Sequence, residues 1–226
     1  MKQMKNYLIE NRQVILMPLA AFLVNVLVYG GGRLLASGKK HYDFTLRIDE
    51  LTPFIPWTML IYWGCFVFWI LVYLRMASLT RKEAGHFFLM HLIGELTCFL
   101  FFVFLPTTNV RPAVDGADLW SALVRLQYRA DAADNLFPSI HCMISWICWV
   151  DMRKQKSCPQ WARTASLLTA LAVFISTLTL KQHVIVDVIS AVIVGEAANQ
   201  LAKLPVLLEP FCKLWERMLR KTLPTD

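Results

Sequence analysis

Charged residues are scarce in this sequence. Asp, Glu, Lys and Arg make up 17% of the 226 residues, whereas hydrophobic residues make up 57%, and the mean hydropathy is +0.48. Soluble globular domains carry about 25% charged residues, so this composition excludes that class. The sequence is that of an integral membrane protein.

Closely spaced cysteines, internal repeats and low-complexity tracts are also missing. No two of the six cysteines are two residues apart, and none falls in the long polar stretches 31–56 and 106–136. This distribution predicts neither a disulfide framework nor a thiolate metal site. Because no long linker separates two apolar regions, we expect a single membrane domain over residues 1–226.

Six long apolar segments are present instead. They are Val14–Gly30, Trp57–Leu74, Phe87–Leu105, Phe137–Val150, Ala165–Leu180 and Val184–Val206. Several are shorter than the roughly 20 residues that a membrane-crossing helix needs, but their aromatic or weakly polar flanks extend them. The predicted fold class is an all-α polytopic membrane protein with six transmembrane helices. We expect the first segment to stay in place as a span and not to be removed as a signal peptide.

The net charge of +7 fits a membrane topology. With the N-terminus inside, 15 of the 23 Lys and Arg residues fall on the inner side: before the first segment, at 75–82, at 153–163 and from Lys203 onward. This asymmetry follows the positive-inside rule. It predicts cytoplasmic termini and makes a nucleic-acid partner unnecessary to explain the charge.

Two connecting regions are amphipathic. The tail 207–226 places Phe211, Leu214, Trp215 and Met218 at helical spacing, which predicts a cytoplasmic helix lying along the inner surface. The stretch "YDFTLRIDELTPFIPW" in the outer loop mixes charges with apolar residues. It is either a connector that positions the second span or a gate for substrate.

Three candidate catalytic or binding residues fall on one face of the membrane. Arg111 follows the third segment, His141 opens the fourth, and His183 opens the sixth after the fifth has returned across the membrane. The charge asymmetry assigns that face to the extracytoplasmic side. Their convergence predicts an active site there.

The spacing of these residues suggests roles for them. Asp187 lies four residues after His183, so a carboxylate can hold one imidazole nitrogen while the other attacks a substrate. His141 is then a candidate general acid for the leaving group. Arg111 and Lys181 supply positive charge for a phosphoryl group, and Pro138–Ser139 suits a helix start that favours an anion.

Other polar residues lie at membrane depth without a matching pattern. They are His91, Glu95 and Glu196. Two interpretations stay open for them: hydrogen bonding between helices, or lining a cavity.

Taken together, "PSIH", "KQHVIVDV" and the upstream "RP" resemble the motifs of the type-2 phosphatidic acid phosphatase superfamily. The resemblance implies that superfamily's six-helix, haloperoxidase-like core with a site near the extracytoplasmic face. It implies that His183 forms a phosphohistidine, that Asp187 orients it and that His141 protonates the leaving group. It further implies that Arg111 and Ser139 hold the phosphate, and it implies neither a metal nor a cofactor.

The sequence departs from the family motifs at three positions. Phe104 stands where the family has lysine, Ile140 where it has glycine, and Ser176-Thr177 where it has Ser-Arg. Two phosphate-binding cations are therefore missing, and Lys181 is a candidate replacement for one. Together with "DELTPFIP", the pattern looks most like the inositol phosphorylceramide synthase branch, in which an alcohol can take the phosphoryl group.

The leading hypothesis is a metal-independent lipid phosphatase or lipid phosphotransferase. Its substrate is a phospholipid or a polyprenyl phosphate from the bilayer, and its acceptor is water or an alcohol. One alternative is a metal-dependent membrane hydrolase with His141, His183 and Asp187 as ligands. Another is a lipid or proton-coupled transporter without catalysis. The sequence predicts no oligomeric state.

Overall fold

The computed structural model describes residues 2–221, and it describes side chains from residue 12 to residue 220. Residues 222–226 of the predicted cytoplasmic tail lie outside the described residues. The helices and strands are α1 (Lys2–Ala36), β1 (Tyr42–Asp43), α2 (Arg47–Leu51), the 3-10 helix η1 (Pro56–Thr58), α3 (Met59–Ala77), α4 (Arg81–Phe104), β2 (Thr107–Thr108), α5 (Leu119–Ala130), α6 (Ile140–Met152), α7 (Gln160–Thr179), α8 (Ile185–Leu201) and α9 (Pro205–Lys221).

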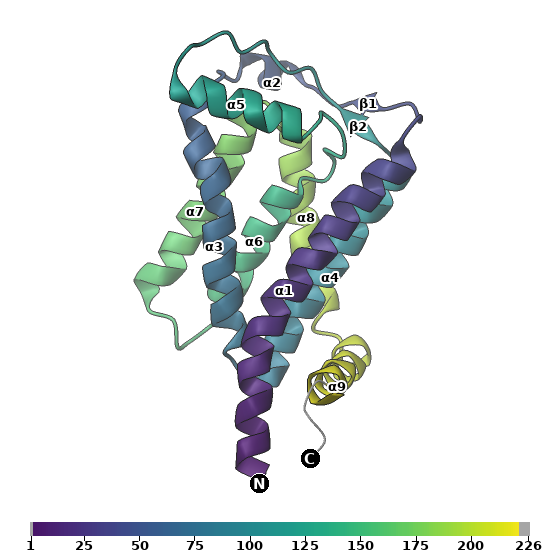
Figure 1. Ribbon diagram of the computed structural model, residues 1–226, viewed down its shortest axis with the longest axis vertical. Helices are drawn as coiled ribbons and strands as arrows, with labels where there is room; N and C mark the ends of the chain where they lie inside the picture. Colours follow the sequence, from purple (N-terminus) through teal and green to yellow (C-terminus); the bar gives the residue numbers. More distant parts are fainter. Residues whose placement is uncertain (1, 222–226) are drawn as a thin grey trace.

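Six helices form the body of the molecule. Helices α1, α3, α4, α6, α7 and α8 run along its long axis, with α6 inside the group (Figure 1). The short elements α2, α5, β1 and β2 gather at one end, and α9 lies at the other end near the start of α1 (Figure 1). Strands β1 and β2 pair in parallel, with Tyr42 opposite Thr107. This pairing ties the segment after α1 to the segment after α4.

Four helical stretches are long and apolar enough to cross a membrane: Arg12–Ala36, Pro56–Ala77, Arg81–Phe104 and Gln160–Thr179. Helices α8 and α9, bent by 82°, form a pair that would make a fifth. Helix α6 has 13 residues and is therefore about 20 Å long, shorter than the roughly 30 Å hydrocarbon core. The protein is thus a mostly helical membrane protein with four or five membrane-capable helices among its described residues.

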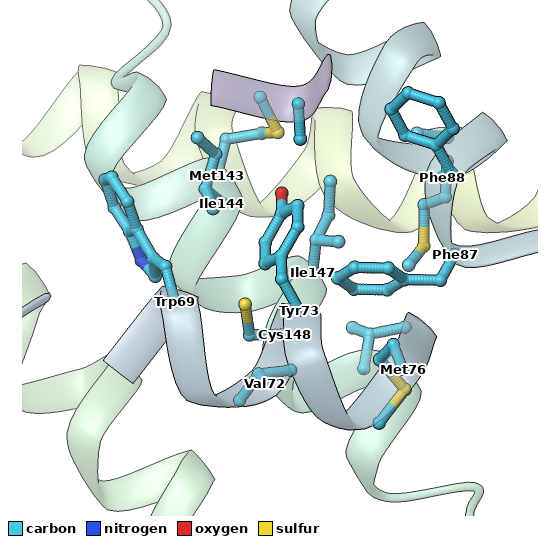
Figure 2. Packing of buried hydrophobic residues seen from close by; sticks show 14 of the residues in the cluster. Trp69, Val72, Tyr73, Met76, Phe87, Phe88, Met143, Ile144, Ile147 and Cys148 are labelled. Carbon is cyan, nitrogen blue, oxygen red and sulfur yellow. The ribbon is translucent and has the colours of Figure 1, made fainter. Parts of the chain in front are cut away.

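The core lies where α3, α4 and α6 meet (Figure 2). Tyr73 and Phe87 meet edge to face with ring centroids 4.7 Å apart, and Met143 and Ile147 are fully buried against them. Within a membrane, close van der Waals packing of such side chains stabilises the association of the helices. This core fixes the start of α6, which carries His141.

Helix α9 packs against α4 through one apolar stripe. Trp215 and Leu219 are buried, and the Trp215 ring lies 4.9 Å from the ring of Phe88. The stripe predicted from the sequence also included Leu214 and Met218, but these side chains are 56% and 51% exposed. They face the surroundings because the helix turns its Trp215–Leu219 edge toward α4.

Candidate active site

His183 lies in the turn between α7 and α8. Lys181, two residues earlier, has φ of 53°, a left-handed conformation that is uncommon for residues other than glycine. This conformation lets the N–H groups of Gln182 and His183 both donate to the carbonyl of Thr177, at 3.0 and 3.2 Å. The end of α7 therefore holds the backbone of His183 directly.

Asp187 holds the imidazole of His183. Its Oδ2 lies 3.2 Å from His183 Nδ1 and accepts the N–H of Val184 at 3.0 Å. The sequence analysis explained this contact by helical spacing, but α8 begins at Ile185. The contact forms because Asp187, in the first turn, reaches back past the helix start. It leaves His183 Nε2 without a hydrogen bond among the described residues.

The start of α6 is joined to the start of α8. Ser139 is the N-cap of α6, as Pro138–Ser139 predicted, and its Oγ accepts the N–H of Cys142 at 3.3 Å. Its own N–H donates to the carbonyl of Asp187 at 3.2 Å. Because Ser139 is fully buried, its hydroxyl caps a helix here and does not face open space.

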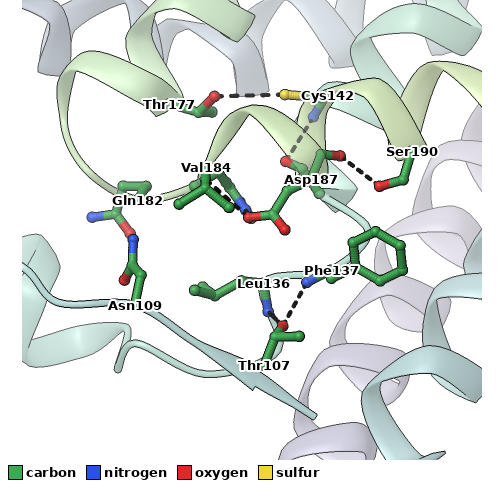
Figure 3. A network of polar contacts seen from close by, with 12 residues as sticks. Thr107, Asn109, Leu136, Phe137, Cys142, Thr177, Gln182, Val184, Asp187 and Ser190 are labelled. Atoms are coloured by element: carbon green, nitrogen blue, oxygen red, sulfur yellow. Dashed lines mark hydrogen bonds and ion pairs between the residues drawn. The ribbon is translucent and has the colours of Figure 1, made fainter. Parts of the chain in front are cut away.

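Thr107, the first residue of β2, holds the chain that leads into α6. Its Oγ1 accepts the N–H groups of Leu136 and Phe137 at 3.2 and 2.9 Å (Figure 3). The segment before the Pro-Ser-Ile-His motif is thereby fixed to the parallel strand pair.

His141 faces His183. The two ring centroids lie 6.0 Å apart. The His141 ring stacks on Tyr62 at 4.6 Å and lies 5.7 Å from the ring of Trp69, both on α3. These aromatic rings orient the imidazole, since no hydrogen bond to it is formed by the part of the chain that the structure describes.

The outer loop holds α8 through Asp49. Asp49 Oδ1 accepts the N–H of Ile185, the first residue of α8, at 2.7 Å. Its Oδ2 accepts the N–H of Leu46 at 2.9 Å. A carboxylate from a distant segment thus satisfies a free N–H at this helix start and complements the helix dipole. These contacts give the "DELTPFIP" segment a positioning function.

A cavity of about 190 Å³ lies between the two histidines. Its lining comes from α1, α3, α5, the loop before α6, the start of α6 and the turn before α8: Asn25, Tyr29, Phe66, Trp69, Gln127, Asp131, Asp134, Asn135, Leu136, Ile140, His141, Gln182 and His183. No Lys or Arg stands among these described lining residues, whereas two carboxylates do. The lining therefore offers an anion imidazole and amide nitrogens but no side chain with a fixed positive charge.

Arg111 lies behind this cavity, not in its lining. Its Nη2 donates to Gln182 Oε1 at 2.8 Å, and its guanidinium lies 4.8 Å from the ring of Tyr128. Burial raises the pKa of Tyr128 to about 12, so the phenol stays protonated and donates to the carbonyl of Leu180 at 2.7 Å. Arg111 thus contacts the cavity through Gln182.

Gln182 itself is a site residue that the sequence analysis missed. It is 1% exposed, lines the cavity beside His183, and its Nε2 has no hydrogen bond partner among the described residues. Buried amide donors are normally satisfied, so an unpartnered one beside His183 makes Gln182 a candidate contact for an anion. In the sequence, only its position directly before His183 indicated that Gln182 could belong to the site.

Lys181 points elsewhere. Its Nζ donates to the carbonyls of Asp49 and Thr52 at 2.5 and 2.6 Å. It lines a second cavity, of about 760 Å³, formed with the outer loop. His183 lines both cavities, the one among the helices and the one under the loop.

The structure also answers the question about the other polar residues. Glu196 accepts hydrogen bonds from Trp146 and Arg153 at 3.2 and 2.9 Å, which is a helix-packing role. His91 and Glu95 lie on α4, deep among the helices.

No group of three or more His, Cys, Asp or Glu within residues 2–221 has an arrangement that could hold a metal ion.

Comparison with known proteins decides the family. The model of the PAP2 superfamily matches residues 50–200, about two thirds of the chain, and this range includes His141, His183 and Asp187. The chain belongs to the PAP2 superfamily. Membership supports a phosphatase or phosphotransferase type of function. No curated protein and no solved structure matches the chain, so the branch within the PAP2 superfamily rests on the motifs alone.

Proposed function

We propose that this PAP2 protein is a membrane lipid phosphatase or lipid phosphotransferase that works through a phosphohistidine on His183. The observation that carries the proposal is the pair His183–Asp187 facing His141 across a cavity among apolar helices. An imidazole held on one nitrogen by a carboxylate is oriented to attack with the other.

In the first step, His183 Nε2 attacks the phosphorus of the lipid. The Nε2–P bond forms and the bond from phosphorus to the leaving oxygen breaks. The leaving oxygen takes a proton from His141, which acts as general acid. The proton on His183 Nδ1 stays in its hydrogen bond to Asp187, whose carboxylate stabilises the positive charge on the ring.

In the second step, an oxygen of water or of an alcohol attacks the phosphorus from the side that the leaving group has vacated. His141, now neutral, accepts the proton of the attacking oxygen, and the Nε2–P bond breaks. Water gives free phosphate or a phosphate monoester, whereas an alcohol gives a new head group. Both outcomes use the same residues, so the acceptor decides between hydrolysis and transfer.

Phosphate binding in this proposal relies on a neutral donor. Gln182 Nε2 is buried, unpartnered and beside His183, and Arg111 holds its amide through Oε1. We therefore assign Gln182 to contact with the phosphate and Arg111 to its positioning. The predicted phosphate-binding role of Lys181 is not part of the proposal, because two carbonyl oxygens already bind its ammonium group.

The proposed topology has six spans and cytoplasmic termini, with the histidines near the extracytoplasmic face. The charge asymmetry supports this orientation. Helix α6 is short for a span. In the proposed topology the chain just before it, which Thr107 holds at Phe137, completes the crossing on the outer side. The inositol phosphorylceramide synthase-like branch remains the proposed branch.

The test is covalent labelling of purified protein in detergent. Wild-type protein incubated with a lipid whose phosphate carries ³²P should gain acid-labile label, and His183→Ala should gain none. His86→Ala is the matched control, since His86 lies near the start of α4 and lines a separate cavity that contains neither His141 nor His183. Wild-type turnover by His183→Ala would overturn the mechanism.

A further inference from the structure

A third cavity, an apolar chamber, adjoins the catalytic cavity. It has a volume of about 290 Å³ and is lined by α1, α3, α4 and α6: Pro18, Ala21, Phe22, Asn25, Phe66, Trp69, Ile70, Tyr73, His91 and Ile144. Asn25, Phe66 and Trp69 line both spaces. The two cavities therefore meet at these three side chains.

The chamber lies deeper among the helices than the histidines. On α6, Ile144 follows His141 by three residues, which is about 4.5 Å along the axis. On α1, Pro18 precedes Asn25 by seven residues, or about 10 Å. A lipid with its phosphorus at His183 would thus place its tail in this chamber.

The chamber also meets the outer surface of the helices. Phe22, Phe66 and Ile70 line it and are 60%, 43% and 56% exposed. All three belong to helical stretches that can cross a membrane, so the surface between α1 and α3 faces lipid. This gives the chamber lateral access from the bilayer.

A polar group stands at the junction of the two cavities. Asn25 Nδ2 donates to Glu95 Oε1 at 2.9 Å, linking α1 to α4. Glu95 is fully buried, and its Oε2 has no hydrogen bond partner among the described residues. Ionisable residues at membrane depth are costly and generally functional. Glu95 orients the Asn25 amide, and Asn25 lines both cavities.

Tyr73 and His91 extend this polar group along the chamber wall. The Tyr73 hydroxyl and His91 Nδ1 lie 2.7 Å apart, and His91 Nε2 lies 4.0 Å from Glu95 Oε1. Four polar side chains thus line or adjoin an otherwise apolar space one to two turns below the histidines. An isoprenoid chain has no group that could hydrogen-bond to them.

We infer that Asn25, oriented by Glu95, is a specificity-determining residue that binds the polar linkage between phosphate and tail of the lipid substrate. The substrate class is then a lipid with an ester, amide or hydroxyl at that linkage, and not a polyprenyl phosphate. This inference rests on the proposed function for its placement of the phosphate.

The test compares Asn25→Leu with wild type on two substrates, a ceramide phosphate and a polyprenyl phosphate of similar chain length. A buried hydrogen bond is worth about 0.5–1.5 kcal/mol, which is about two- to tenfold in kcat/KM. We expect wild type to prefer the ceramide phosphate and Asn25→Leu to lose two- to tenfold of that preference. The ratio of the two activities is independent of how much protein is folded.

Gln13→Leu is the matched control. Gln13 is another amide on α1, and it is buried, but it donates to the carbonyl of Ala77 at 2.8 Å, away from both cavities. It should leave the ratio unchanged. An unchanged ratio in Asn25→Leu, or a wild type that prefers the polyprenyl phosphate, would overturn the inference.

Lipid binding to delipidated protein, measured by native mass spectrometry, separates this inference from the proposed function. If wild type turns over neither lipid and gains no label, the proposed function fails. Weaker binding of the ceramide phosphate alone to Asn25→Leu would still support the subsite. Equal binding of both lipids by the variant and wild type would refute it.

Discussion

Replacing Asp49 by asparagine tests whether the outer loop positions the catalytic turn. Asp49 is 7% exposed, and each of its carboxylate oxygens accepts one backbone N–H, from Ile185 and from Leu46. Asparagine has the same shape but only one acceptor oxygen. One of these N–H groups must then face an NH₂ group.

The expected loss can be worked out from these two bonds. A hydrogen bond to a charged acceptor contributes about 1.5–3 kcal/mol, and loss of a helix N-terminal cap costs about 0.5–2 kcal/mol. The asparagine keeps one neutral hydrogen bond. We therefore expect Asp49→Asn to lower the free energy of unfolding by about 2 kcal/mol.

The assay is thermal unfolding in detergent together with the rate of phosphoenzyme formation. Glu50→Gln is the control, because Glu50 is the exposed neighbour of Asp49 in the same helix. Asp49→Asn should melt earlier and react more slowly, since Ile185 follows His183 by two residues and begins the helix that carries Asp187. A variant with wild-type stability would refute the capping role, and a destabilised variant with a wild-type rate would refute the positioning role.

Three further changes test other parts of the site. Gln182→Glu replaces an amide donor by a carboxylate of the same shape. Orthovanadate, a phosphate analogue, should then bind to the variant at least tenfold more weakly than to wild type, as measured by titration calorimetry. Unchanged binding would contradict the donor role of Gln182. Lys181→Gly and Lys181→Ala both lose the ammonium contacts, but of the two residues only glycine suits φ of 53°. The free energy of unfolding of the glycine variant should therefore be about 1 kcal/mol higher than that of the alanine variant. Equal stabilities of the two variants would contradict this. The pKa of Asp118 is lowered, mainly because the Ser121 hydroxyl donates to its carboxylate. The stability that Asp118 gives to α5 should therefore be present at pH 7 and be lost as the pH falls through that lowered pKa. An Asp118→Ala variant should therefore melt earlier than wild type at neutral pH and like wild type in acid, and a difference that persists in acid would contradict the linkage.

Much of the helical framework follows from the sequence. Each of the six apolar segments contains one long-axis helix, because a continuous apolar run must satisfy its backbone within a helix when it is surrounded by lipid. The end of α8 was harder to predict. The segment Val184–Val206 reads as one apolar run, yet the chain bends by 82° between α8 and α9. Pro205, which opens α9, is the local reason.

The site was predictable only where its residues share a motif. The pair His183–Asp187 and the histidine at the start of α6 could be found from spacing and parity. The places of Asn25 and Tyr29 in the cavity lining could not be predicted, because both residues belong to α1, an apolar helix with no motif of its own. Their contact with the cavity depends on how α1 packs on α3 and α4, which is a tertiary property.

The missing family cations affect the charge of the site more than its geometry. Thr177 occupies the position of the family arginine, and it holds the catalytic turn through its carbonyl, which accepts the N–H groups of Gln182 and His183. Its side chain is fully buried and donates to the carbonyl of Phe174 at 2.8 Å. Any residue at this position would offer the same carbonyl. The backbone can therefore keep His183 in place whichever side chain stands at position 177.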